Sequence, residues 1–199
     1  MSNTIKTMAG VLALTSFSLF TQADITEPRT HFYLGLAAGA GGGETEFEGN
    51  FTITEDMDTT LSALVLGVEF RTGNRFEVSF TSITADFEDA TDEDEFSGID
   101  FDWKFPFGEE TIKPFLGLGF GLYTWEDTAD LFVDDEDLSG IALNLMGGAL
   151  FQPHEHLEFE AGYQYKGIGW QTIRPVGSST DVETSTSMGN LYLSAKYKF

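Results

Sequence analysis

The stretch MGNLYLSAKYKF, residues 188–199, alternates apolar and polar side chains up to the last residue of the chain. Leu191, Leu193, Tyr197 and Phe199 fall on one face of an extended strand, because successive side chains of a strand point to opposite sides. The lysines of the stretch fall on the other face. The pattern predicts a β-strand with one apolar face, and other segments of the chain must supply its partners.

Seven more segments show the same alternation, and no window after residue 23 shows sustained helical periodicity. They are residues 31–40, 61–70, 76–81, 96–105, 112–123, 141–149 and 157–166. Short turns alternate with long acidic connections, and Gly73 offers the positive φ that a tight hairpin needs. The sequence therefore predicts an all-β fold, an eight-stranded antiparallel up-and-down barrel.

The first 23 residues have a different character. Lys6 precedes an apolar run at residues 8–20, and the small residue Ala23 follows, which is the pattern of a secretory signal. The run is shorter than the roughly 20 residues that a transmembrane helix needs. We expect residues 1–23 to be a cleaved signal peptide and residues 24–199 to form a single barrel domain.

The charge balance and the absence of cysteine exclude some classes of protein. The chain has 33 acidic and 10 basic residues, for a net charge of −23, and no cysteine. Such acidity argues against a nucleic-acid partner, whose phosphates would repel the protein. Without cysteine, an exported domain must be held together by hydrogen bonds and packing instead of disulfides.

One face of every predicted strand is uncharged along its middle, whereas the other carries charges. In a soluble barrel the uncharged face would line the interior, and in a membrane barrel it would face lipid. Periodicity alone leaves both arrangements open. The export signal, the terminal aromatic residue, the alternation of short and long connections and the glycines on the polar face favour the transmembrane barrel, because glycines leave room for long side chains in a narrow interior.

With Phe199 preceded by Tyr197, Leu193 and Leu191 on one face, the chain resembles the eight-stranded outer-membrane barrels of the OmpA transmembrane-domain, OmpX and Ail kind. The resemblance implies a location in the cell outer membrane, contact with its lipid and lipopolysaccharide, and recognition of Tyr197 and Phe199 by the barrel-assembly machinery. We expect a monomer. The resemblance is specific for fold and weak for function, because these barrels have varied roles.

In the membrane arrangement, the charged face forms a network inside the barrel. Its predicted members are Glu69, Glu77, Asp100, Asp102, Lys104, Lys113, Glu158, Glu160, Lys166, Lys196 and Lys198. The near balance of acids and lysines fits paired charges, because an unpaired buried charge is costly. Two interpretations follow, a salt-bridged plug that stabilises the barrel and a narrow pore in which ion pairs exchange.

The acidic connections suggest weak cation binding, because Ca²⁺ and Mg²⁺ prefer carboxylate oxygens. The candidate ligands are Asp92, Asp94, Asp135 and Asp137, and the simpler interpretation is a solvated acidic surface. No cofactor is predicted.

The three histidines, His31, His154 and His156, fall at the ends of strands beside short turns, and they predict no catalytic centre. The sequence favours a non-enzymatic barrel with a structural or surface-interaction role, and its alternative is a narrow channel for small solutes or ions.

Overall fold

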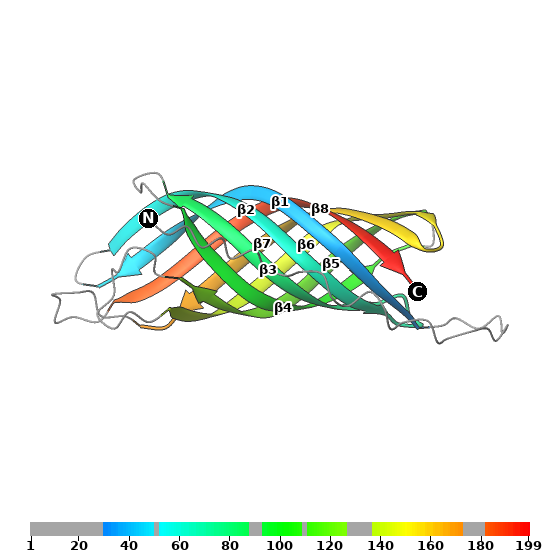
Figure 1. The fold of residues 1–199 in the computed structure, drawn as a ribbon, viewed down its shortest axis with the longest axis horizontal. Helices are drawn as coiled ribbons and strands as arrows, with labels where there is room; N and C mark the ends of the chain where they lie inside the picture. The colour runs from blue at the N-terminus through cyan, green and yellow to red at the C-terminus, as the bar shows by residue number, and fades with distance from the viewer. Residues whose placement is uncertain (1–29, 50–51, 88–92, 109–110, 127–136, 173–181) are drawn as a thin grey trace, which may run out of the picture.

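The computed structural model describes residues 30–49, 52–87, 93–108, 111–126, 137–172 and 182–199, which form a closed antiparallel barrel (Figure 1). Its eight strands are β1 (His31–Glu48), β2 (Thr52–Glu69), β3 (Arg75–Phe87), β4 (Asp94–Pro106), β5 (Ile112–Trp125), β6 (Leu138–His154), β7 (Leu157–Trp170) and β8 (Glu183–Lys198). Each strand pairs with its neighbours in sequence, and β1 also pairs with β8. The predicted fold class is confirmed.

The two ends of the barrel differ in their connections. At one end, which we call the turn end, lie residues 70–74, 107–108 and 155–156 together with the start of β1 and the end of β8. Gly73 has a φ of 85° in the first of these turns. The Gly73 amide donates a hydrogen bond to the Phe70 carbonyl at 2.8 Å. The remaining connections define the opposite end, which we call the loop end.

Closure depends on the strand that ends the chain. The register places Leu34 beside Tyr197 and Ala40 beside Leu191, so both apolar faces point outward together. Beyond the ladder, the Phe199 amide donates a hydrogen bond to the Phe32 carbonyl at 2.9 Å. The first and last strands therefore close the barrel without leaving an open edge.

The outward face carries a wide apolar band. On β6 the band runs from Ile141, through Leu143 at 69% exposure, to Phe151. At about 3.3 Å per residue and a tilt of about 40°, this stretch rises roughly 25 Å along the barrel axis, the height of the apolar band of outer-membrane barrels. A continuous band of exposed leucine and isoleucine side chains of this height would be unfavourable in water.

The strands extend much further at the loop end than the sequence indicates. The predicted loop at residues 41–60 is wrong, because β1 and β2 pair continuously up to Glu48 and Thr52. Inward positions such as Thr45, Met57 and Thr59 remain buried in this extension, whereas its outward positions are polar or acidic. Pairing continues here because backbone hydrogen bonds do not require an apolar outer face.

Similar extensions lengthen the other strands at the loop end. β3 continues to Phe87, β7 continues to Trp170 and β8 begins at Glu183, so the predicted loops at residues 86–95 and 167–187 are shorter than expected. The described residues include no helix with the length and apolar character needed to cross a membrane.

Candidate functional site

The interior of the barrel holds nearly all of the buried charge. Arg75, Lys104, Lys166 and Lys196 are each at most 4% exposed, as are several of the acids that they contact. Every second residue of a strand points inward, so the polar face predicted from the sequence becomes the lining of the interior. The charged residues form three groups, which follow one another from the turn end toward the middle.

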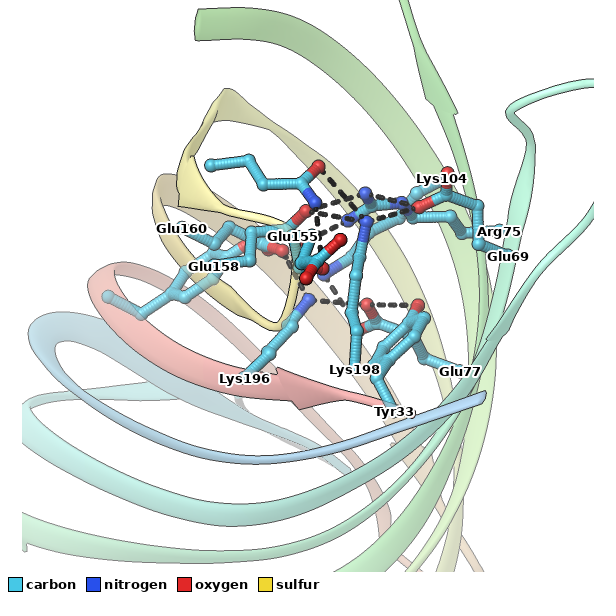
Figure 2. Close-up of polar contacts among 12 residues, drawn as sticks. Tyr33, Glu69, Arg75, Glu77, Lys104, Glu155, Glu158, Glu160, Lys196 and Lys198 are labelled. Carbon is cyan, nitrogen blue, oxygen red and sulfur yellow. Dashed lines mark hydrogen bonds and ion pairs between the residues drawn. The ribbon is translucent and has the colours of Figure 1, made fainter. Parts of the chain in front are cut away.

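The first group, the turn-end network, consists of Glu69, Arg75, Glu158 and Lys198 (Figure 2). Arg75 binds Glu158 through two hydrogen bonds of 2.5 and 2.7 Å, and it reaches Glu69 at 2.7 Å. Lys198 contacts the same two acids at 2.7 and 3.3 Å. Because β3 and β7 lie opposite each other in the strand order, the bidentate pair of Arg75 and Glu158 crosses the barrel.

The second group, the ring network, consists of Glu77, Lys104, Glu160 and Lys196 (Figure 2). Lys104 lies 2.8 Å from Glu77 and 2.5 Å from Glu160, and Lys196 contacts the same two acids. The four side chains come from β3, β4, β7 and β8, so the ion pairs again join opposite walls. Each carboxylate meets two ammonium groups, which compensates its burial.

Two tyrosines donate hydrogen bonds to the acids of the ring network. The Tyr33 hydroxyl donates to Glu77 at 2.9 Å, and the Tyr192 hydroxyl donates to Glu160 at 2.5 Å. The Tyr33 ring lies over Gly67 of β2, where an added Cβ would come within 2.2 Å of it. A glycine is therefore required at residue 67 for this close approach.

The third group, the Asp100 network, lies nearer the middle of the barrel. Lys166 binds both Asp100 oxygens at 2.8 Å and also contacts the Tyr123 hydroxyl. Asp100 accepts further hydrogen bonds from Tyr123 at 2.6 Å, Thr81 at 2.9 Å and Asn144 at 2.9 Å. Asp100 is thus fully surrounded by donors, as a buried carboxylate requires.

The loop-end half of the interior is largely apolar and aromatic, with a few buried threonines among the rings, and the sequence did not predict this. We call Phe87, Phe96, Trp125 and Trp170 the aromatic layer, and all four are buried. The ring centroids of Trp125 and Trp170 lie 5.5 Å apart, and Phe96 lies 5.1 and 5.4 Å from them. Aromatic contacts at these distances add to the stability gained from burial.

A signal for the aromatic layer does exist in the sequence. Trp125 lies two residues after the inward Tyr123, and Trp170 lies four residues after the inward Lys166, so both keep the period of two. Both lie beyond the predicted strands because acidic residues follow Trp125, and a polar stretch with Arg174 and Pro175 follows Trp170. The inward side of a strand can therefore be followed past the point where its outward side stops being apolar.

The observed charge network differs from the predicted one at Arg75 and Lys113. Arg75 is absent from the predicted network, because residues 71–75 have the composition of a turn, but it is the first residue of β3 and only 1% exposed. Lys113 is half-buried near the turn end of β5, and no described residue forms an ion pair with it. The other predicted members, and Lys198, all lie inside the barrel. Asp102 is buried and accepts a hydrogen bond from Asn144 at 3.1 Å.

The predicted assembly residues lie on the outward face of β8. Tyr197 and Phe199 are exposed, and their rings pack edge to face with centroids 5.2 Å apart. Their recognition by the assembly machinery stays a prediction.

The predicted cation ligands are only partly visible. Asp92 and Asp135 lie outside the described residues, Asp94 begins β4, and Asp137 is exposed just before β6. Within the described ranges, no group of three or more acids or histidines is arranged to hold a metal ion. Cation binding by these aspartates stays a prediction.

The three histidines lie at the turn end. His156 stacks on Tyr197 with centroids 5.7 Å apart, and its Nδ1 lies 3.0 Å from the Lys198 carbonyl oxygen. His31 lies 3.4 Å from the Phe199 backbone oxygen, through its Nδ1. These contacts hold the end of β8 against its neighbours.

Comparison with known proteins identifies the family. The model of the outer membrane protein beta-barrel domain matches residues 9–199. The chain belongs to this family. It is therefore a protein of the outer membrane, and the apolar band of its outward face is the surface that contacts lipid.

Several solved structures share the fold of this outer-membrane barrel. Neisserial surface protein A is 19% identical, with a TM-score of 0.55, and the alignment covers 84% of this chain and 97% of that one. Outer membrane protein H of P. aeruginosa is 20% identical (TM-score 0.51; 84% and 99% covered), and AlkL is 13% identical (TM-score 0.51; 90% and 95% covered). No curated protein matches the chain. At these identities, the likeness extends to the fold alone.

Proposed function

We propose that the protein is a non-enzymatic outer-membrane barrel with a sealed interior and a structural or surface-interaction role. The observation that carries the proposal is the ring network, in which Glu77 and Glu160 each bind both Lys104 and Lys196 across the barrel. Moving one of these side chains aside leaves its two partners sharing a single counter-charge, so one buried charge is uncompensated, which costs several kcal/mol. A solute that passes through the barrel would have to break these contacts.

The aromatic layer supports the proposal independently. It lies toward the loop end from the charged groups, and Ile83, Leu138 and Met188 are buried around it. An ion that crossed this part of the barrel would lose hydration and meet no buried charged side chain among the described residues, only a few hydroxyl and amide groups such as those of Thr186 and Asn190. Ion pairs and apolar packing thus form two barriers in series.

The outer face of the loop end supports a surface role. We call its outward carboxylates the acidic rim, and they are Glu44, Glu46, Glu48, Asp56, Asp58, Asp86, Glu95 and Glu183. The described loop-end extensions of the strands, residues 41–48, 52–60, 83–87 and 183–187, contain no lysine or arginine.

Some carboxylates of the acidic rim lie directly opposite one another. Glu44 pairs with Asp56, Asp58 pairs with Asp86 and Glu48 pairs with Glu183 across adjacent strands. Like charges in such positions destabilise a sheet. Because the acidic rim weakens the fold, we infer that it is retained for contacts outside the barrel. We propose that the rim faces the cell exterior, at the level of the lipopolysaccharide. We also propose that the protein is a monomer.

Conductance in a planar bilayer tests the sealed barrel. We expect refolded protein, shown to be folded by its heat-modifiable electrophoretic migration, to give no discrete openings in concentrated KCl. Reproducible unitary openings would contradict the proposal and favour the alternative function, a narrow channel for small solutes or ions.

A further inference from the structure

The buried charges of the barrel interior do not balance. The turn-end network has two acids and two cations, the ring network has the same, and Lys166 neutralises Asp100. Asp102 remains. Among the described residues no cation forms an ion pair with Asp102, although its side chain is only 5% exposed.

The neighbouring cations are already engaged. Lys166 directs its three donors to Asp100 and Tyr123, and Lys104 binds Glu77 and Glu160. The Asn144 amide is the partner of Asp102, at 3.1 Å, and the same amide also serves Asp100. One buried negative charge is therefore left without a counter-charge, which is costly in a low-dielectric interior.

A small cavity adjoins this carboxylate. Its volume is about 40 Å³, and the residues that line it include Asp102, Ser79, Thr81, Gln164 and Ser194, together with the ring network, whose Lys104 and Lys196 are paired with Glu77 and Glu160. The Ser194 hydroxyl is buried, in a residue only 6% exposed, and no described residue forms a hydrogen bond with it. At roughly 10–15 Å³ for each water-sized particle, the cavity has room for about three of them.

We propose that this cavity binds one monovalent metal cation, Na⁺ or K⁺, with Asp102 as its charged ligand and Ser194 as a neutral ligand. One positive charge balances the interior, and the hydroxyl and amide oxygens replace part of the hydration shell of the ion. A divalent ion suits the site less, because such ions usually take several carboxylates, and no group of three acids or histidines occurs in the described part of the chain.

The experiment measures the unfolding temperature of the refolded barrel in detergent. Chloride salts of Na⁺, K⁺ and N-methylglucamine are compared at one ionic strength, so that screening is constant. We expect the unfolding temperature to be higher in Na⁺ or K⁺, by about 3 °C at 100 mM, and to saturate with concentration, as binding to the folded state predicts.

Asp102→Asn keeps the size of the side chain and removes its charge. We expect this variant to lose the dependence on the cation while unfolding in N-methylglucamine at or above the temperature of the wild type. Asp58→Asn, the same change on the acidic rim, is the matched control and should keep the dependence. Should Asp102→Asn fail to refold, Ser194→Ala is the second variant, and it should raise the Na⁺ concentration at half effect several-fold.

Three outcomes would overturn the proposal. The first is a wild-type unfolding temperature that is equal in all three salts. The second is a cation effect that survives in Asp102→Asn or disappears in Asp58→Asn, which would place the site elsewhere. The third is an unfolding temperature that depends on pH through Asp102 but not on the identity of the cation, because a proton would then neutralise the carboxylate.

Discussion

Lys104 contacts both carboxylates of the ring network, so replacing it leaves Glu77 and Glu160 with Lys196 as their shared cation. We predict that Lys104→Met lowers the free energy of unfolding by about 3 kcal/mol, because an uncompensated negative charge stays buried. Urea titration of the refolded barrel, followed by tryptophan fluorescence, measures the change. Methionine has nearly the length of lysine, so lost volume contributes little.

Lys113→Met is the matched control for this prediction, because Lys113 is half-buried and outside the three networks. We expect its urea midpoint to stay within the error of the wild type. Equal effects of the two substitutions would show that the ion pairs of Lys104 contribute nothing specific to stability.

Gly67 is the second position where a single residue decides the packing. Gly67→Ala would place a methyl group against the Tyr33 ring and displace the hydroxyl that donates to Glu77. We predict a loss of about 2 kcal/mol in the free energy of unfolding, from strain and a weakened hydrogen bond. Gly167→Ala is the control, because nothing lies within 4 Å of the added atom, and it should be neutral or slightly stabilising.

At the scale of the strand, the two faces of β4 and its neighbours meet different surroundings. Trp103 is on the outward face of β4 at 40% exposure, whereas Trp125 and Trp170 are buried inside the barrel. In single-tryptophan variants reconstituted in vesicles, we predict that brominated lipids quench Trp103 strongly and the other two weakly. Strong quenching of Trp125 or Trp170 would contradict the inward placement of the aromatic layer.

The alternation of side chains was sufficient to divide each strand into an apolar and a charged face, and the export signal, the terminal aromatic residue and the connection pattern predicted that the apolar face points outward. The outward face is uniformly apolar between Phe32 and Ala40 on β1, and similar runs mark the other strands. The length of the strands could not be predicted in this way. Beyond the lipid, the outward face of a strand is polar, and so is a loop, so the sequence does not show where a strand ends. The register of Glu44 with Asp56 depends on backbone hydrogen bonds, which leave little trace in composition.

The same limit explains the errors at the candidate site. Arg75 follows a turn containing a glycine and another arginine, so its composition indicated a turn, although it begins the inward face of β3. Lys113 has the parity of an inward residue, but it lies near the turn end of β5, where no acid among the described residues forms an ion pair with it. The members of the network could be predicted from parity, whereas their partners across the barrel depend on its closure and shear.

At the scale of the whole molecule, the interior has a charged part and a largely apolar part along the same axis, and the proposed seal rests on both. Two barriers in series conduct poorly as long as either one remains. Removing part of one barrier should therefore lower stability without opening a channel, and both must be weakened before ions pass.

We predict that Lys104→Ala and Trp170→Ala are each silent in a planar bilayer and that the double variant conducts. Lys104→Ala removes side-chain volume from the ring network, and Trp170→Ala removes an indole from the aromatic layer, where the lost packing costs about 3–5 kcal/mol. Folding of each variant is checked by its heat-modifiable migration before the recording. Conductance in Lys104→Ala alone would mean that the aromatic layer admits ions, and a silent but folded double variant would mean that the turn-end and Asp100 networks are sufficient to block the barrel.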